Sequence, residues 1–452
     1  MSEKRAAVIL AAGQGSRMRS GLPKVLHAVG GRAMLDWSVA MARAALCERL
    51  VIVANPAMED VKARAVALAG AAGLALQHEP KGTGHAVLAA KEALAGHEGA
   101  VAVLYGDTPL IQAETVALMF ALRAEKGGIV VLGFEAGVPT GYGRLILDEQ
   151  GRVARIVEEK DATDDERAVK VCNSGVFVAD AAILFNLLSM VRNDNAKGEY
   201  YLTDIVGLGR SSGFFTHLIR CPENEVLGVN SRVDLAGAEA VFQARARRAA
   251  LEAGVTMIDP DTVYFSHDTQ IAQDVTIEPG VVFGPGVRME TGAVIHAYSH
   301  IAGAHIGPGA KVGPFARLRP GTELGRAVKI GNFVEVKNAV FGEKAQASHL
   351  TYVGDADVGA GANLGAGTIT CNYDGFDKHR TVIGAGAFIG SDTALVAPVT
   401  VGAGAYTGSG SVITKDVPDD ALAVARGELR MIPGWAAKFR ARKLANRKKG
   451  EA

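Results

Sequence analysis

The sequence predicts an α/β protein of two domains, in which an open, mostly parallel sheet is followed by a parallel β-helix. Three observations lead to this fold class. Short apolar runs alternate with helical patterns through the first half, an apolar residue returns every six positions from Ile271 onward, and the pattern changes near residue 254. A chain of 452 residues is also too long for one ordinary hydrophobic core, so we expect each half to bury its own.

The six-residue repeat determines the fold of the second half. With one five-residue step before Ile306, the leading residues of the hexads are Ile271, Ile277, Phe283, Met289, Ile295, Ile301, Ile306, Val312, Leu318, Leu324, Ile330, Val336, Ile383, Ile389, Leu395 and Val401. A period of six does not suit a helix but suits short strands separated by tight corners, which the many glycines permit. Stacked coils would bury the leading residues, whereas an irregular Gly/Ala-rich region would not hold one phase over about 140 residues.

The first half alternates strand-like runs at 7–10, 50–54 and 100–104 with helical patterns at 34–46 and from Thr83. This alternation predicts an open sheet with helices on its faces. Such sheets bind their ligands outside the carboxyl ends of the strands. We therefore look for functional residues directly after each predicted strand.

Charge and cysteine content narrow the class of protein. Lys plus Arg and Asp plus Glu both number 48, so no overall field favours nucleic acid or a membrane as partner. The cysteines are far apart with no CxxC pair, which suits a reducing cytoplasm and argues against a disulfide or thiolate zinc framework; they are Cys47, Cys172, Cys221 and Cys371. No apolar stretch has transmembrane length, and residues 6–13 are interpreted as a buried strand because no cleavage site follows them. We expect a cytoplasmic protein.

A glycine-containing loop follows the first strand, from Leu10 to Lys24. Gly13 and Gly15 would let backbone amides close on an anion, and Arg17 and Lys24 add positive charge. The third glycine of a dinucleotide fingerprint is absent, because methionine stands in its place, and no GxxxxGK[ST] motif occurs here. The loop therefore indicates a nucleotide site of another kind.

The segment from Tyr105 to Pro109 follows the strand at 100–104. A carboxylate at such a strand end, Asp107, could hold Mg²⁺ against phosphate oxygens. The alternative is that Asp107 caps the next turn. Its pairing with the glycine loop favours the metal.

These segments resemble the sugar nucleotidylyltransferases, together with Gln77, Lys81 to Gly84, Gly141 to Arg144, Ile156 to Glu158, Asn173 to Gly175 and Gly228 to Asn230. With the β-helix, the resemblance covers nearly the whole chain. It is to the bifunctional bacterial family that combines N-acetylglucosamine-1-phosphate uridylyltransferase with glucosamine-1-phosphate acetyltransferase.

The resemblance implies a Rossmann-like nucleotidyltransferase domain over 1–229, a linker helix over 230–253, a left-handed β-helix acetyltransferase domain over 254–437 and a basic tail over 438–452. It also implies a homotrimer that makes UDP-N-acetylglucosamine. Acetyl-CoA would acetylate glucosamine-1-phosphate, and UTP with Mg²⁺ would then donate its uridylyl group with release of pyrophosphate.

For the uridylyl reaction, the sugar phosphate is already an anionic nucleophile, so catalysis needs charge neutralisation and alignment more than a general base. The resemblance assigns Mg²⁺ to Asp107 and Asn230, and the catalytic positive charges to Arg17 and Lys24. It assigns UTP and UDP-sugar contacts to Leu10, Gly13, Lys24, Gln77, Gly82, Thr83, Tyr105, Asp107, Gly143, Glu158, Asn173 and Asn230.

In the β-helix, Arg319 and Lys337 replace the glycine that usually follows the leading residue, and they are three hexads apart. If three hexads make one coil, the two side chains lie at one corner of successive coils, about 4.8 Å apart. Like charges so close repel, and a shared anion such as a sugar phosphate explains them. Two unrelated, solvent-screened cations remain the alternative.

His349 lies in a segment, 347–352, that breaks the hexad pattern. Acetyl transfer requires a neutral amine, and an imidazole, whose ordinary pKa is about 6.5, suits the removal of its proton. Glu335 is either its orienting partner or a solvated carboxylate. The resemblance assigns the acceptor sugar phosphate to Arg319, Lys337, Tyr352 and Asn363. It assigns acetyl-CoA to Ala366, Asn372, Tyr373, Lys378, Ser391, Ser409 and Arg426, where Ser409 stands at a position commonly occupied by alanine and its role stays open.

Three alternatives remain at this point. His296, His300 and His305 have a spacing that resembles the zinc site of β-helical carbonic anhydrases, although ordinary surface histidines are the favoured interpretation. The basic residues of 438–452 are either a solvated end or an anion site. Finally, the β-helix could serve only to oligomerise a monofunctional sugar-1-phosphate nucleotidylyltransferase, or the protein could be a non-catalytic assembly scaffold.

Overall fold

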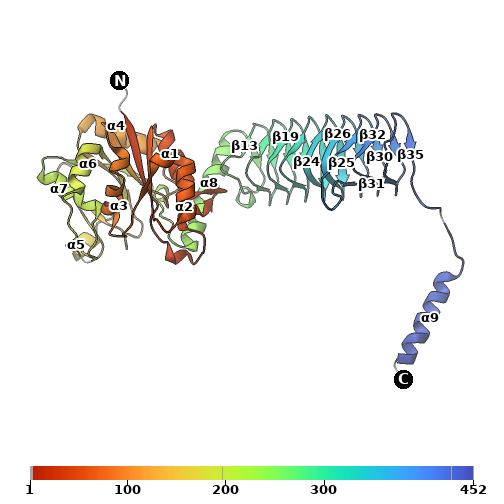
Figure 1. The fold of residues 1–452 in the computed structure, drawn as a ribbon, viewed down its shortest axis with the longest axis horizontal. Helices are drawn as coiled ribbons and strands as arrows, with labels where there is room; N and C mark the ends of the chain where they lie inside the picture. Colours follow the sequence, from red (N-terminus) through yellow and green to blue (C-terminus); the bar gives the residue numbers. More distant parts are fainter. Residues whose placement is uncertain (1–3, 196, 429, 451–452) are drawn as a thin grey trace. The chain divides into compact units, whose positions relative to one another are not determined.

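The computed structural model describes residues 4–195, 197–428 and 430–450. The chain divides into two compact units (Figure 1). The first contains the residues up to Ala249 together with Phe265–His267, and the second contains Ala250–Tyr264 and the residues from Asp268 onward. The α/β fold class predicted from the sequence is confirmed.

The first unit is built on a nine-stranded sheet of order β5-β4-β1-β6-β10-β7-β11-β9-β8. The strands are β1 Arg5–Leu10, β4 Arg49–Ala54, β5 Leu74–Leu76, β6 Ala100–Tyr105, β7 Ile129–Glu135, β8 Arg144–Leu147, β9 Val153–Val157, β10 Val171–Asp180 and β11 Thr216–Cys221. The strands β5, β4, β1 and β6 are parallel, and β10 runs antiparallel to β6 and β7. The chain order reverses at β1, so the carboxyl ends of β1 and β6 mark the point where such sheets bind ligands.

Helices cover both faces of this sheet. The helices α1 Met34–Ala44, α2 Glu59–Ala69 and α4 Ala113–Lys126 pack on one face, and α3 Thr83–Ala89, α6 Ala181–Leu188 and α7 Ile205–Ser211 pack on the other. Along β1 the side chains alternate accordingly: Ala7 and Ile9 belong to the first core cluster, whereas Ala6 and Val8 belong to the second. Because both faces are buried, the strand is apolar from Ala6 to Leu10.

The remaining short elements of this unit are β2 Ala28–Val29, β3 Arg32–Ala33 and α5 Asp164–Arg167. Helix α8, Arg232–Glu252, then leads toward the repeats. Its N-terminus is capped, because the amide of Asp234 donates to Oγ of Ser231 at 3.2 Å and the Asp234 carboxylate accepts from the amide of Ser231 at 2.9 Å. Gly254 follows with φ 89, a value that glycine adopts without strain.

The second unit is a stack of coils built from very short parallel strands (Figure 1). One sheet contains β12 Thr256–Met257, β14 Thr276–Ile277, β17 Val294–Ile295, β20 Lys311–Val312, β23 Lys329–Asn332, β25 Gln346–His349, β27 Asn363–Leu364, β30 Phe388–Ile389, β33 Tyr406–Thr407 and β35 Leu422–Ala423. The other contains β13 Gln270–Ile271, β15 Val282–Phe283, β16 Arg288–Met289, β18 His300–Ile301, β19 Ala304–Ile306, β21 Arg317–Leu318, β22 Thr322–Leu324, β24 Glu335–Phe341, β26 Tyr352–Val358, β28 Ile369–Cys371, β29 Thr381–Ile383, β31 Ala394–Val396, β32 Val399–Val401 and β34 Val412–Ile413.

The register of the coils confirms the repeat. Ile277 lies beside Ile295, which lies beside Val312 in the next coil. The leading residues are buried, except that Ile271 at the first coils is only partly buried. Most steps from coil to coil span three hexads or fall one position short of that, but the step from Leu364 to Ile389 is longer because a loop is inserted there.

The last element, α9 Trp435–Gly450, is a helix whose side chains are exposed from Trp435 to Lys443. The basic segment predicted over 438–452 falls within it, apart from residues 451–452, which lie outside the described residues. Among the described helices, we find none with the length and apolarity required to cross a bilayer.

Candidate active sites

A cavity of about 300 Å³ lies at the carboxyl ends of β1 and β6. The structure brings eight of the predicted residues to its lining: Leu10, Gly13, Lys24, Gln77, Gly82, Thr83, Tyr105 and Asp107. Arg17 belongs to the same loop but is exposed and does not line the cavity.

The glycines of this site permit close approaches of the backbone. Gly15 has φ 63, and a Cβ there would lie 2.6 Å from Cβ of Lys24. Gly82 has φ 105, and a Cβ there would lie 2.7 Å from the carbonyl oxygen of Tyr200. Side chains at either position would therefore push the loop away from Lys24 or displace the start of α3.

Lys24 is the centre of the polar contacts in the cavity. Its Nζ donates to Oδ2 of Asp107 at 2.5 Å and to Oδ1 of Asn230 at 3.1 Å. Asn230 reaches this place because the amide of the preceding Val229 donates to the Asp107 carbonyl at 2.9 Å. A carboxylate and an amide oxygen thus converge on one cation, here an ammonium group. Oxygen donors of this kind suit Mg²⁺, so the residues present fit the metal that the resemblance implies.

The predicted sugar contacts gather on one side of Tyr105. The amide of Asn173 donates to the Gly143 carbonyl at 2.8 Å, and a Cβ on Gly143 would lie 3.5 Å from Oε1 of Glu158. Gly175, two residues after Asn173, is pressed against the Tyr105 ring, since a Cβ there would lie 2.7 Å from it. These backbone contacts hold the β8–β9 hairpin beside the cavity.

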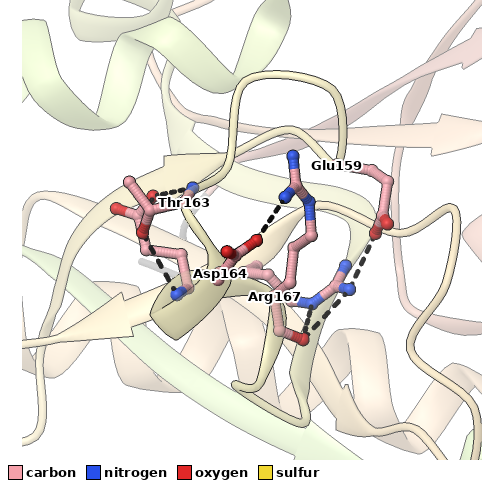
Figure 2. A network of polar contacts seen from close by, with 6 residues as sticks. Glu159, Thr163, Asp164 and Arg167 are labelled. Carbon is pink, nitrogen blue, oxygen red and sulfur yellow. Dashed lines mark hydrogen bonds and ion pairs between the residues drawn. The ribbon is translucent and has the colours of Figure 1, made fainter.

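A polar network fixes this hairpin from behind (Figure 2). The buried Arg144 donates to the Glu159 carboxylate at 2.7 Å and to the Arg167 carbonyl at 3.4 Å. Thr163 caps α5 in a capping box with Glu166. Because Arg144 and Glu159 are the chain neighbours of Gly143 and Glu158, the network determines where these two predicted sugar contacts lie.

Burial shifts the pKa values of two residues on the sugar side. Burial raises the pKa of Glu158, and the neighbouring Asp161 and Asp204 add to this, while Lys197 and Thr203 act in the opposite direction. Burial, with repulsion from Asp107 and Glu158, also raises the pKa of Tyr105. A buried carboxylate without a full counter-charge favours hydroxyl groups as ligands, because they donate hydrogen bonds to it.

A cluster of cations lies along one corner of the β-helix. Arg319 is adjacent to Lys337 in the next coil, as the pairing of Leu318 with Val336 requires. Lys378 comes from the inserted loop, and its close side-chain approach to Lys337 is the largest cause of a lowered pKa of Lys337; burial and repulsion from Lys378 and Arg319 contribute, and Asp355 opposes the shift. Amino groups held together in this way favour an anionic ligand.

Asp355 lies between the cation cluster and Asn372, one of the coenzyme contacts predicted from the sequence. It is 8% exposed, and it accepts hydrogen bonds from Nδ2 of Asn338 at 2.6 Å and from Nδ2 of Asn372. Sequence reasoning missed Asp355. The signal was available, since positions 338, 355 and 372 are all polar and are separated by equal steps of one coil.

Other predicted contacts lie near this corner. A Cβ on Gly354 would lie 2.3 Å from the Tyr352 hydroxyl and 2.8 Å from Nδ2 of Asn372, so these two side chains are close together. The hydroxyl of Tyr373 donates to the Gly375 carbonyl at 2.6 Å within the inserted loop.

A second corner carries His349 and three predicted coenzyme residues in one column. Pairing of Ala347 with Leu364, and of Leu364 with Ile389, places His349, Ala366 and Ser391 at equivalent positions of successive coils. The pairing of Phe388 with Tyr406 adds Ser409, whose carbonyl accepts from Nη1 of Arg426 at 3.3 Å. Asn363 lies in β27, between Gln346 and Phe388 of the neighbouring strands.

The ring of His349 has a partner that the sequence did not suggest. Its Nδ1 lies 2.6 Å from Oδ1 of Asn332. Glu335, considered as an orienting partner, instead accepts from Nη1 of Arg319 at 2.8 Å and lies 3.6 Å from Nη1 of Arg317. Register explains the difference, because Asn332 is paired with His349 whereas Glu335 is paired with Tyr352.

The three histidines considered as a zinc site have separate surroundings. Nδ1 of His296 contacts Glu278 at 2.9 Å, and His305 lies between Glu290 and Glu323. Across the described ranges, no three His, Cys, Asp or Glu side chains form a group able to hold a metal ion. The geometry gives no support to the zinc alternative.

Comparison with known proteins identifies the family of both halves of the chain. Residues 7–169 match the family model of the MobA-like NTP transferase domain, and residues 303–338 and 380–415 match that of the bacterial transferase hexapeptide (six repeats). The chain is 57% identical over 445 residues to "Bifunctional protein GlmU" of Hyphomonas neptunium, covering 98% of this chain and 96% of the relative. It is 58% identical over 447 residues to the protein of the same name from Maricaulis maris, covering 99% and 98%, and 57% identical over 440 residues to that of Rhodospirillum rubrum, covering 97% and 98%. The chain therefore belongs to the GlmU family of bifunctional enzymes, which join a uridylyltransferase to an acetyltransferase.

Proposed function

We propose that the two reactions of this enzyme run at two separate sites, acetyl transfer around His349 and uridylyl transfer around Lys24 and Asp107. In this order, glucosamine-1-phosphate is acetylated by acetyl-CoA, and N-acetylglucosamine-1-phosphate then reacts with UTP to give UDP-N-acetylglucosamine and pyrophosphate. The observation that carries the proposal for the first unit is the convergence of Lys24, Asp107 and Asn230 in the cavity.

In the uridylyl site, Asp107 and Asn230 would hold Mg²⁺, which when bound neutralises charge on phosphate oxygens. Lys24 would then release its contacts with these two residues and bind phosphate oxygens of UTP. The exposed Arg17 would meet the departing pyrophosphate when the glycine loop closes on the nucleotide.

The lining residues divide between the two substrates. Leu10, Gly13, Gln77, Gly82 and Thr83 surround the cavity on the side proposed for UTP. The sugar would be held beside Tyr105 by Gly143, Glu158 and Asn173. Hydrogen bonds from sugar hydroxyls would satisfy the partly buried Glu158 carboxylate.

In the acetyl site, the amine nitrogen of glucosamine-1-phosphate would attack the thioester carbonyl while Nε2 of His349 takes a proton from that amine. A new C–N bond forms, the C–S bond breaks, and coenzyme A leaves as the thiol after receiving a proton. Arg319 and Lys337 would hold the sugar phosphate, and Tyr352 and Asn363 the sugar.

The proposed coenzyme contacts are Ala366, Asn372, Tyr373, Lys378, Ser391, Ser409 and Arg426. Their arrangement supports this assignment. Ala366, Ser391 and Ser409 continue the column that begins at His349, so a coenzyme lying along this corner would bring its thioester to the base.

We also propose a homotrimer. The loop between Asn372 and Arg380 ends in Phe376, which is 91% exposed, and an apolar tip of this kind favours burial against another subunit. A three-fold arrangement closes without leaving repeating contacts.

The four free cysteines suit a reducing compartment, and we place the enzyme in the cytoplasm.

The test supplies glucosamine-1-phosphate, acetyl-CoA, UTP and Mg²⁺, omits each in turn, and follows thiol and pyrophosphate release. Because N-acetylglucosamine-1-phosphate forms at the acetyl site, pyrophosphate release by each variant is measured with that acceptor supplied directly. Asp107→Asn should lose most pyrophosphate release yet keep acetyl transfer, and His349→Ala should do the reverse. If either substitution abolished both activities in a folded protein, the two-site assignment would be wrong. Pyrophosphate release with no acetylation under any condition would favour the monofunctional alternative.

A further inference from the structure

Asn332 lies one coil away from His349 and contacts its ring. Oδ1 of Asn332 is 2.6 Å from Nδ1 of His349, and the two residues are register partners in the parallel strands β23 and β25. Within the described part of the chain, no other side chain is hydrogen-bonded to this ring. The histidine therefore has one orienting contact, and it comes from an amide rather than a carboxylate.

The backbone holds both residues rigidly. The amide of Leu350 donates to the Asn332 carbonyl at 3.1 Å, and Oγ1 of Thr351 donates to the His349 carbonyl at 2.7 Å. A Cβ on Gly331 would lie 1.9 Å from the Ser348 carbonyl oxygen, so the coils are in close contact at this corner. Contact between the two side chains thus follows from the register and does not depend on a mobile loop.

The contact determines which ring nitrogen carries the proton. A carbonyl oxygen only accepts hydrogen bonds, so Oδ1 of Asn332 requires a hydrogen on Nδ1 of His349. In the neutral imidazole, Nε2 is then unprotonated and able to accept a proton. The opposite orientation of the amide would donate to Nδ1 and leave the hydrogen on Nε2, where a base is needed.

We propose that Asn332 is a positioning residue of the acetyl site, which holds His349 in the tautomer with its hydrogen on Nδ1 and Nε2 free. The proposal rests on the proposed role of His349 as the base. A neutral amide fixes the tautomer without adding negative charge beside the ring. The carboxylate that could have done so, Glu335, is held by Arg319 instead.

The test uses the full-length enzyme with Asn332→Ala, Asn332→Asp and the control Lys329→Ala, which changes an exposed residue of the same strand. Asn332→Ala should lower kcat/KM of acetyl transfer about ten- to a hundred-fold, the range seen when partners that orient metal-bound histidines are removed. Asn332→Asp keeps an acceptor and should restore most of the rate. The acid limb of the pH–rate profile of Asn332→Asp should move to higher pH by about one unit, because the carboxylate favours the imidazolium form of His349.

Pyrophosphate release from UTP with N-acetylglucosamine-1-phosphate supplied directly should stay unchanged in all three variants, which checks folding of the rest of the chain. An unchanged rate and pH profile in both Asn332 variants, while His349→Ala loses acetyl transfer, would overturn the role of Asn332 alone. If His349→Ala keeps acetyl transfer, the proposed base itself is wrong. Should the variants not fold, ¹⁵N NMR of the histidine rings in the unmodified enzyme decides: a hydrogen on Nδ1 supports the proposal, and a hydrogen on Nε2 overturns it.

Discussion

The ammonium group of Lys24 lies 2.5 Å from the carboxylate of Asp107, in the place where two oxygen ligands converge. Both side chains are largely buried, with 11% and 18% of their surfaces exposed. A lysine in this position neutralises Asp107 before a metal binds, so metal binding and the release of Lys24 toward the nucleotide phosphates are coupled.

Lys24→Met should therefore have opposite effects on metal binding and on catalysis. Without the competing ammonium, Mn²⁺ should bind the nucleotide-free enzyme more tightly, as electron paramagnetic resonance can measure. Pyrophosphate release should fall by about 10² to 10³, because a positive charge on the phosphates is lost. Acetyl transfer is the control and should not change. Unaltered Mn²⁺ affinity would show that Lys24 does not compete for the metal oxygens.

Arg319→Ala should discriminate between two acetyl acceptors. If Arg319 binds the phosphate, kcat/KM for glucosamine-1-phosphate should fall about ten- to a hundred-fold, the worth of one charged hydrogen bond, while the low activity with glucosamine should hardly change. Arg317→Ala is a matched control, because Arg317 also faces Glu335, at 3.6 Å, but lies one residue before the leading position. An equal penalty for both acceptors would remove the phosphate role.

The contact between Lys337 and Lys378 predicts how affinity for glucosamine-1-phosphate depends on pH. The close approach of the Lys378 side chain, followed by burial and repulsion, lowers the pKa of Lys337. The ammonium is therefore lost at a lower pH than in an ordinary lysine, and affinity for glucosamine-1-phosphate should fall as the pH rises through this lowered value. Lys378→Met removes the first cause and should move the decline to higher pH. Calorimetric titration without coenzyme measures it, and a decline that stays in place would contradict the coupling of the two amines.

Much of the fold could be predicted from the sequence because its signals are local. The hexad positions and the glycine loop after β1 each carry their meaning within a few residues. The contact of Lys24 with Asn230 could not be predicted without a resemblance, because it joins residues 206 positions apart. Its geometry depends on how a strand end and the segment before α8 meet in space.

In the β-helix, the sequence predicts the corners of the coils but not every side-chain contact at them. The separation of Arg319 and Lys337 by three hexads identified one corner, and the register agrees with it. Glu335 also lies in the coils that carry the proposed acetyl site, but its side chain contacts Arg319 and not His349. Coils that are one position shorter than three hexads shift the corner positions relative to a strict hexad count, so Asn332 could be recognised only from the actual pairing.

Asp355→Ala should destabilise the β-helix and weaken coenzyme binding together. The substitution leaves the amides of Asn338 and Asn372 without their acceptor. Asn372 is buried, so we expect the loss of its acceptor to cost about 1–3 kcal/mol of unfolding free energy, whereas water can satisfy the exposed Asn338. Asp355→Asn should cost less, because it retains one acceptor oxygen. Denaturant unfolding and KM for acetyl-CoA are the measurements, and a lowered stability with unchanged KM would limit Asp355 to a structural role.

The same carboxylate predicts an acid limit of stability. Burial alone would raise the pKa of Asp355, but hydrogen bonds from Asn338 and Asn372 and the charges of Lys337 and Lys378 outweigh it, so the pKa is lowered. A carboxyl group whose pKa is lower in the folded state stabilises the fold above its ordinary value of about 3.9, and this contribution is lost as the pH falls through the folded value. The Asp355→Asn variant should lack that part of the decline, and identical acid unfolding curves for both proteins would refute the assignment.

Fragments of the chain test one further part of the trimer proposal, namely that the loop around Phe376 lets neighbouring subunits complete the acetyl site. A fragment from Ala250 onward contains the second unit and should stay trimeric and acetylate. A fragment of residues 1–267 retains Asn230, α8 and Phe265–His267, which belong to the first unit, and should be monomeric and at most transfer uridylyl groups. Ending it near Val229 instead would remove the proposed metal ligand. Light scattering and the two assays decide the matter: a monomeric C-terminal fragment with full acetyltransferase activity would show that neighbouring subunits do not complete the site.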